Sequence, residues 1–481
     1  MIFNSLSFLL FFIIIFFLCA WIGFSGKIDV KQKVQYRNII LLIASYYFYA
    51  FLKWEFLLLL LFTTLVNYVA GYQLGKSESN MRKKRCWLWM AVLLSVGVLA
   101  YFKYANFFID SVNQAFSLIG IEPKMQLMKI ILPVGISFFT FQALSYTLDV
   151  YHGKIHARRS FIDVALFVSF FPTILSGPIE KARNLLPQLE SPSVISANAV
   201  LEGGKRFLWG LFKKIVIADR LGEFVDTIYS RSDLSVFSSQ TLIIAAVFYS
   251  VQIYADFSGY SDMAIGIAKA LGFQLKENFN YPYFSTSIKT FWKRWHISLT
   301  SWFSEYLYIP LGGNRVSRFR WMFNISAVFL VSGLWHGANW AFIVWGALHA
   351  IYYLIEFFLN KRNHKVILPD WLNVILKGLS CFFVFALVTI AWIFFRMEDS
   401  AKACLMIENM FTSSVSGVYL GASSFETALT GLLLVVFIIM DWIRFREYKV
   451  SWVGSAVFYA VILCMILLFG VSSGGFVYFQ F

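Results

Sequence analysis

The residue best placed to do chemistry in this sequence is a histidine at the junction of two apolar segments. His336 lies between Gly333 and Gly337 in the run SGLWHGANW. An ionisable side chain inside a membrane is costly unless it is paired or faces water. Glycines beside it let a backbone or a substrate approach closely. The pattern suits an imidazole that takes a proton from an attacking hydroxyl during acyl transfer. A histidine that merely bonds a neighbouring helix is the structural alternative, and position alone favours it slightly.

Two side chains near this histidine carry hydrogen-bond donors. Asn339 follows His336 by three residues and lies on the same face if the turn is helical. The Asn339 amide and the Trp335 indole can donate N–H groups to a developing oxyanion. We therefore predict both as substrate-binding residues from their proximity in sequence. His349 follows Trp345 by four residues on an uninterrupted apolar pattern, and we interpret it as structural.

A second histidine lies in the basic, tryptophan-rich run FWKRWHISLTSWFSEYLYIPLGGNR, residues 291–315. Its apolar residues recur at steps of three and four, which predicts one amphipathic helix at the cytoplasmic interface. His296 lies at the edge of that stripe, and Pro310 with the following glycines ends the element. Arg294 is a candidate contact for an anionic substrate group. Lipid anchoring explains the same residues without any catalytic role.

An aspartate in the run QIYADFSGYSDM is the third candidate. Asp256 lies near the end of an apolar segment, and an intramembrane carboxylate is a functional candidate by default. The structural alternative is that Asp256 caps a helix broken at Ser258-Gly259, a common use of aspartate.

Other kinds of active site lack their motifs. The six histidines form no HExxH array, so a metal site is not predicted. The sequence has no GxSxG elbow, P-loop or GxGxxG motif after a strand, which argues against a serine hydrolase or an ATPase. The five cysteines are scattered without CxxC spacing, so neither a disulfide framework nor a metal site is expected. No bound cofactor is predicted.

The elements that must position these residues are membrane helices. The chain has 481 residues, of which 59% are hydrophobic and 14% charged, so much of its surface must meet lipid. A helix needs about 20 apolar residues to span the bilayer core. Eleven segments are predicted to span: 5–24, 36–52, 54–74, 87–102, 128–150, 240–257, 321–336, 338–359, 372–395, 426–444 and 452–475.

Charge in the short loops predicts the orientation. The net charge of +15 comes from basic residues between apolar spans, which fits the positive-inside rule and anionic lipid rather than nucleic acid. Clusters such as Arg82 to Arg85, Lys361 with Arg362, and Arg444 to Lys449 should be cytoplasmic, which leaves both termini outside. An even number of crossings must separate two cytoplasmic loops, so only one of the segments 161–177 and 206–222 can cross the membrane completely. We predict that 161–177 is re-entrant, because Ser176-Gly177-Pro178 breaks a helix.

The motifs together resemble those of the membrane-bound O-acyltransferase family. They are DFSGYSDMAIG, ENFNYPYFS, the run at 291–315, and GLWHGANWAFIVWGALH, with weaker agreement at 132–146, 176–188 and 210–221. Within the family, the chain is most similar to the branch that acetylates alginate and peptidoglycan. The resemblance covers most of the chain in pattern, with the motif core at 252–349, and indicates one integral membrane domain over residues 1–481.

The resemblance implies an all-α polytopic fold, with about eleven transmembrane helices plus re-entrant and interfacial helices around a central funnel. It implies that His336 and His296 are catalytic. It also implies that an acetyl group moves from a cytoplasmic thioester, acetyl-CoA, to an extracytoplasmic polysaccharide. A separate extracytoplasmic acyltransferase protein would complete delivery, and the bacterial inner membrane is the expected location. D-alanyl transfer to teichoic acid, a transporter or flippase of an activated intermediate, and a scaffold for polysaccharide export remain the alternatives.

Overall fold

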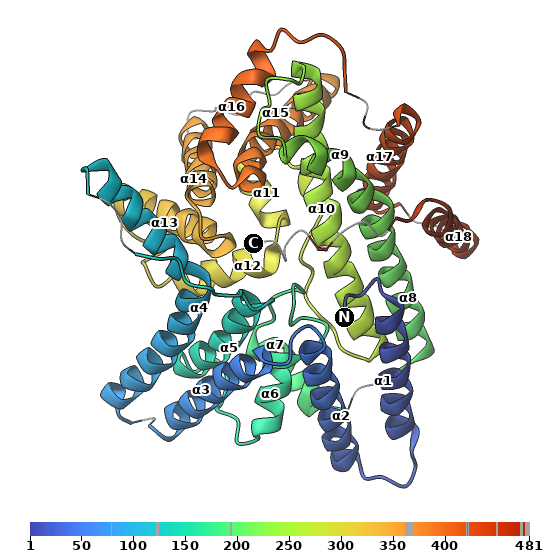
Figure 1. Ribbon diagram of the computed structural model, residues 1–481. Helices are drawn as coiled ribbons and strands as arrows, with labels where there is room; N and C mark the ends of the chain where they lie inside the picture. The colour runs from blue at the N-terminus through green and yellow to red at the C-terminus, as the bar shows by residue number, and fades with distance from the viewer. Residues whose placement is uncertain are drawn as a thin grey trace. The chain divides into compact units, whose positions relative to one another are not determined.

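Every regular element in the described part of the chain is helical, as expected for an all-α membrane protein (Figure 1). The computed structural model describes residues 1–481 except 78, 122–124, 193–194, 361–368, 420, 422, 449–450, 472–474 and 477–481. The chain divides into two compact units that are interleaved in sequence. The first comprises Met1–Phe207 and Tyr260–Lys276, and the second comprises Leu208–Gly259 and Glu277–Phe481. The basic pair Lys361 and Arg362, used above for orientation, lies outside the described residues, as does Lys449.

The first unit is built from the N-terminal helices. They are α1 (Leu6–Phe24), α2 (Val30–Ala50), α3 (Phe56–Lys76), α4 (Met81–Leu118), α5 (Ile136–Tyr151), α6 (Phe161–Ser169), α7 (Ala182–Glu190) and most of α8 (Ala197–Phe212). Helix α3 packs against α4 and α5, and α2 packs against α1 and α6. Side chains just before the helices cap them: Ser5 accepts a bond from the Phe8 N–H, and Asn80 accepts one from the Lys83 N–H.

The second unit contains the predicted site. It holds the end of α8, the π-helix η1 (Lys213–Ala218), α9 (Asp219–Tyr229), most of α10 (Ser239–Ala270), η2 (Pro282–Phe284), α11 (Ile288–Arg294), α12 (Ile297–Phe303), the π-helix η3 (Ser304–Tyr308), α13 (Arg318–His336), α14 (Trp340–Asn360), α15 (Asp370–Met397), α16 (Ser400–Thr412), α17 (Ser424–Phe445) and α18 (Trp452–Phe469). Helices α13 and α14 form a hairpin, and α15 packs on α14.

Within the described residues, eight of the eleven predicted spans correspond to helices that are long and apolar enough to cross a membrane. They are α1, α3, α4, α10, α14, α15, α17 and α18. Helices α2 and α13 carry more polar and basic residues, and α5 has only 16 residues. The prediction of a helix from residue 128 is wrong at its start. The chain is irregular before Pro133, and α5 begins at Ile136, after Gly135 in the left-handed conformation.

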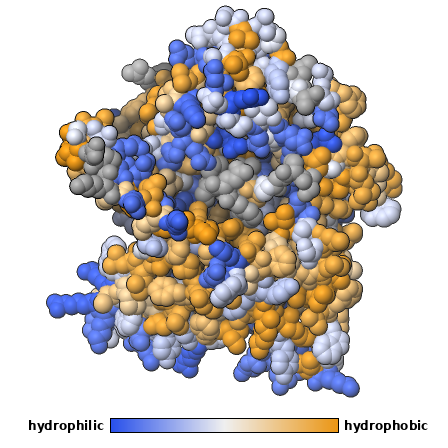
Figure 2. Space-filling view, viewed as in Figure 1, coloured by the Kyte–Doolittle hydropathy of each residue, from blue (hydrophilic) through white to orange (hydrophobic). Residues whose placement is uncertain are grey.

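Hydrophobic side chains on the outward faces are the expected lipid contacts. Figure 2 shows them gathered over α17 and α18 on the right of the view. Phe425 and Leu467 are examples, each with 76% of its surface exposed. Exposed apolar surface on this scale is unusual for a soluble protein and typical of one that faces lipid. The chain is therefore a multi-pass membrane protein.

The segment predicted to be re-entrant contains a short buried helix. Helix α6 has nine residues, so it is about 14 Å long, too short for a hydrocarbon core of about 30 Å. It ends at Ser169, before Pro172 rather than at the predicted Ser-Gly-Pro break, and the chain turns back toward α7. Buried side chains satisfy the freed backbone groups. The Gln142 amide donates to the Phe167 carbonyl, and the Phe171 N–H donates to Ser45 Oγ over 3.1 Å.

Replacing Gln142 with leucine should therefore destabilise the first unit. The substitution keeps the side chain's size but leaves the buried Phe167 carbonyl without this donor, at a cost of about 1–3 kcal/mol. The unfolding midpoint of the purified protein in detergent measures the effect. Gln114→Leu, at an exposed residue of α4, is the matched control. An equal, small change in both variants would contradict this account of the α6 turn.

Candidate active site

His336 is the last residue of α13, where the helix ends against aromatic side chains. Only 4% of its surface is exposed. Its ring centroid lies 4.9 Å from that of Trp335, 5.1 Å from Trp345 on α14 and 5.2 Å from Phe395 on α15. Three helices thus surround the imidazole with apolar rings. Such an environment excludes water and strengthens any polar interaction made there.

Glycines bring α13 and α14 together below this histidine. A Cβ at Gly346 would lie 2.5 Å from the Phe329 carbonyl oxygen, and one at Gly333 would overlap the Phe342 carbonyl. The two helix backbones are therefore closer than side chains would permit, as small residues allow in membrane helix pairs. The predicted close approach of backbone beside His336 is confirmed. The hairpin fixes where α13 ends, and hence where His336 lies.

His296 lies in a break between α11 and α12. Its backbone is left-handed, with φ 43° and ψ 52°, and 1% of its surface is exposed. The prediction of one continuous amphipathic helix through this run is wrong, because the helix is interrupted at Trp295 and His296. A non-glycine residue in this conformation is strained, and surrounding contacts must maintain it. Such outliers cluster at functional sites.

The break brings the two histidines together across 40 residues of sequence. The centroids of the His296 and His336 rings are 6.4 Å apart, and the Trp335 ring lies 6.0 Å from His296. The Phe257 ring of α10 lies nearly perpendicular to the His296 ring, with their centroids 4.6 Å apart. Burial lowers the pKa of His296 to about 3, so this ring is neutral at physiological pH. A neutral His296 ring can accept a hydrogen bond, and a neighbouring imidazole can serve as general base.

The surroundings of Asn339 differ from those predicted from the sequence. Helix α13 ends at His336 and Gly337 is extended, so Asn339 does not follow His336 along a helical face. Instead its Oδ1 accepts the Ala341 N–H over 3.0 Å at the start of α14, and its amide donates to the Glu398 carbonyl. Trp335 is buried beside both histidines. Of the two predicted donors, Trp335 is the one that the fold brings to the histidine pair.

Asp256 on α10 belongs to a buried charge cluster that also includes residues of η1 and α9. Its carboxylate lies 2.8 Å from Lys214 Nζ, which also lies 2.8 Å from Asp219. Lys213 Nζ donates to Ser258 Oγ over 2.8 Å. Helix α10 continues past Ser258 to Ala270, so the alternative that Asp256 caps a broken helix is wrong. We name Lys213, Lys214, Asp219 and Asp256 the charge cluster.

Arg294 is half-buried, and its guanidinium contacts other residues of the second unit. Its guanidinium donates to the Phe284 carbonyl over 3.2 Å and lies 5.1 Å from the centre of the Phe445 ring. His349 is fully buried, and its Nδ1 accepts the Trp292 indole N–H over 3.3 Å.

Sequence reasoning missed Lys214, although paired lysines in the middle of an apolar stretch are a recognisable signal. In the described residues, no group of three or more His, Cys, Asp or Glu side chains is arranged to hold a metal ion.

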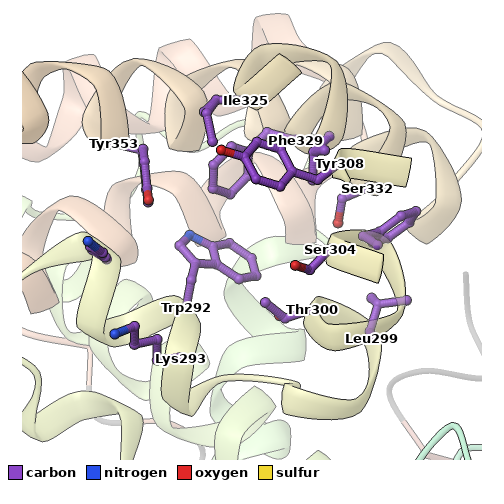
Figure 3. A pocket seen from close by; sticks show the side chains of 13 residues that line it. Trp292, Lys293, Leu299, Thr300, Ser304, Tyr308, Ile325, Phe329, Ser332 and Tyr353 are labelled. Atoms are coloured by element: carbon purple, nitrogen blue, oxygen red, sulfur yellow. The ribbon is translucent and has the colours of Figure 1, made fainter. Parts of the chain in front are cut away.

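A cavity of about 220 Å³ opens between α11, α12, η3 and the α13–α14 hairpin (Figure 3). Its walls are mostly aromatic and aliphatic, including Trp292 and Phe329, with the hydroxyl groups of Thr300, Ser304 and Ser332. Two lysines also line it, Lys289 and Lys293, both solvent-exposed. Ser332 is one helical turn before His336 on α13. The cavity is therefore lined both by basic side chains and by the helix that ends at the buried His336.

Comparison with known proteins agrees with these motifs. A sequence model of the membrane-bound O-acyltransferase family matches residues 6–397. The probable alginate O-acetylase AlgI of Pseudomonas aeruginosa is 39% identical over 452 residues, which cover 93% of this chain and 82% of the relative. The peptidoglycan O-acetyltransferase of Helicobacter pylori is 34% identical over 81% of this chain and 77% of its own length. The teichoic acid D-alanyltransferase of Bacillus subtilis is 28% identical over 48% of this chain and 60% of the relative.

Proposed function

Because the chain belongs to the membrane-bound O-acyltransferase family, we propose that it moves an acetyl group from a cytoplasmic thioester to a hydroxyl of an extracytoplasmic polysaccharide. The observation that carries the proposal is the burial of His336 beside His296, one helical turn from a cavity with basic residues at its wall. The named activities of the alginate and peptidoglycan relatives favour acetyl as the group and a polysaccharide as the acceptor.

The chemistry starts with His336 as the general base. Its neutral imidazole takes the hydroxyl proton while the oxygen attacks the thioester carbonyl carbon. The tetrahedral intermediate then collapses, the carbon–sulfur bond breaks, and the proton passes from His336 to the departing thiolate. The Trp335 indole N–H is the preferred donor to the oxyanion, since its ring lies beside both histidines, whereas the Asn339 side chain bonds the start of α14 and the Glu398 carbonyl. Atoms and charge balance without any bound metal or cofactor.

The donor site is the cavity of Figure 3. Its apolar walls suit the arm of a thioester, and the lysines suit the phosphates at the arm's far end. We take acetyl-CoA as the donor. Arg294 and Arg315, which lie near the cavity in sequence, are secondary candidates for phosphate contact. The donor enters from the cytoplasm, and the loop charges favour an orientation with both termini outside. An extracytoplasmic acyltransferase protein then passes the group to the polymer, and the membrane is a bacterial inner membrane.

Charge reversal at both cavity lysines tests the donor site. Lys289→Glu with Lys293→Glu should raise the KM for acetyl-CoA about tenfold and leave kcat nearly unchanged, because the phosphates meet repulsion while the reacting groups are untouched. Initial rates with purified protein measure both constants. Lys377→Glu, at an exposed lysine of α15 outside the cavity lining, is the control. An unchanged KM in the double variant would show that acetyl-CoA does not bind in this cavity.

The transporter alternative differs in what the purified protein does alone. A transporter moves an activated intermediate without cleaving it, whereas the enzyme, alone or with its partner, releases free thiol from acetyl-CoA in detergent when a hydroxyl acceptor is supplied. The D-alanyl alternative predicts turnover of a D-alanyl thioester in preference to an acetyl one. Two relatives that carry that name match 48% and 58% of this chain, less than the alginate and peptidoglycan relatives, so we place this alternative second.

A further inference from the structure

One buried amide collects three hydrogen bonds beside the histidine pair. Asn278, with 1% of its surface exposed, lies in the segment between α10 and η2. Its Oδ1 lies 3.3 Å from the Ser298 backbone nitrogen, 2.8 Å from Ser298 Oγ and 3.0 Å from His296 Nδ1. All three groups point to the same oxygen. The sequence run ENFNYPYFS gave no reason to single this residue out.

The backbone contact fixes which way the amide faces. A backbone N–H can only donate, so the atom that meets the Ser298 N–H must be the amide oxygen. That oxygen can only accept, so the ring nitrogen that meets it must carry a hydrogen. A neutral imidazole carries one N–H. His296 is therefore protonated on Nδ1, and Nε2 presents a lone pair.

The surrounding backbone holds this arrangement in place. The Ile297 N–H donates to the Asn278 carbonyl over 2.8 Å, and the Asn280 N–H donates to the Arg294 carbonyl over 2.9 Å. These two bonds tie the segment around Asn278 to both sides of the left-handed His296. They explain how a strained conformation is maintained between two helices. Phe257 then closes one side of the ring, and His336 lies on another.

We propose that Asn278 is a positioning residue that fixes the tautomer of His296. Nε2 of His296 then accepts a hydrogen bond from the reacting hydroxyl and does not donate one to the oxyanion. The inference rests on the proposed function for its catalytic consequence. The two histidines then have different roles: His336 takes the proton, and His296 orients the hydroxyl. This tautomer also leaves oxyanion stabilisation to N–H donors such as Trp335.

Two substitutions separate positioning from packing. Asn278→Ala removes the acceptor, so His296 should populate both tautomers and kcat should fall about a hundredfold with little change in the KM for acetyl-CoA. Asn278→Asp retains an oxygen that accepts the same three bonds and should recover kcat to within about tenfold of the wild type. Ser301→Ala removes a hydroxyl that donates to the Ser298 carbonyl and leaves the bonds to Asn278 in place, so it should change kcat less than threefold.

Nitrogen-15 NMR of protein labelled at histidine reads the tautomer directly, with the His296 signals assigned from their loss in His296→Ala. The expected spectrum shows a protonated Nδ1 and a bare Nε2 in the wild type and in Asn278→Asp. A protonated Nε2 in the wild type would overturn the proposal, even if Asn278→Ala did not fold. So would an Asn278→Ala variant with wild-type kcat and tautomer. If the expected tautomer appeared in a protein that transferred no acyl group, the proposed function would fail while the role of Asn278 in setting the tautomer stood.

Discussion

His336→Ala is expected to lower acyl transfer by about 10²–10⁴, the range that general-base catalysis typically contributes. The reason is local: the imidazole lies at the end of α13 among the rings of Trp335, Trp345 and Phe395. Alanine removes the only group assigned to take the hydroxyl proton. The measurement is acetylation of the polymer in cells that carry the variant as the sole copy, together with the rate of the purified protein.

The controls distinguish chemistry from folding. His336→Gln keeps a polar side chain of similar length but has no basic ring nitrogen, so it should be as inactive as alanine and insert normally. His152→Ala changes an exposed histidine whose Nδ1 meets the Leu148 carbonyl, and its activity should stay within twofold of the wild type. Normal polymer acetylation by His336→Ala would remove the residue from the mechanism and revive the scaffold alternative.

Lys214→Met is expected to destabilise the second unit by about 3–5 kcal/mol, the usual result of removing one partner from a buried ion pair. Lys214 is 5% exposed and lies between Asp219 and Asp256. With all four groups ionised, the charge cluster carries two positive and two negative charges. Methionine fills a similar volume but removes the positive charge that stabilises the two buried carboxylates. Equilibrium unfolding of the purified protein in detergent gives the free-energy change.

A rescue experiment tests the electrostatic cause. Adding Asp219→Asn and Asp256→Asn to Lys214→Met removes both carboxylates and should restore a large part of the lost stability. Lys205→Met breaks a more exposed pair with Glu202 and should cost less than about 1 kcal/mol. If Lys214→Met were no worse than Lys205→Met, the charge cluster would have no special role in stability.

The membrane fold could be predicted from the sequence because its signal is local. Long apolar runs specify helices wherever they occur, and eight of the eleven predicted spans match helices long enough to cross. The errors fall where tertiary contacts decide. The residues from 128 to 135 are as apolar as a helix, yet α5 starts only after the left-handed Gly135. Helix α6 ends before Pro172, and buried Ser45 and Gln142 satisfy the backbone groups that are freed there.

The histidine pair was recognisable as two motifs, but its geometry was not. The spacing of Trp292, Trp295 and Leu299 is that of one amphipathic helix, and nothing in the run itself marks a break at His296. Asn278, which is 18 residues away, bonds both the His296 ring and the next helix at this break. Likewise Asp256 was identifiable as a candidate, but its partner Lys214 is 42 residues earlier in the chain. Such pairings appear only when the chain is folded.

The most direct test of the central claim is the release of thiol from acetyl-CoA by purified protein in lipid vesicles, with a soluble polysaccharide acceptor. The account predicts acceptor-dependent turnover in the wild type that falls at least a hundredfold in His336→Ala and in His296→Ala, with all three proteins equally folded. Equal thiol release by the wild type and His336→Ala would contradict it.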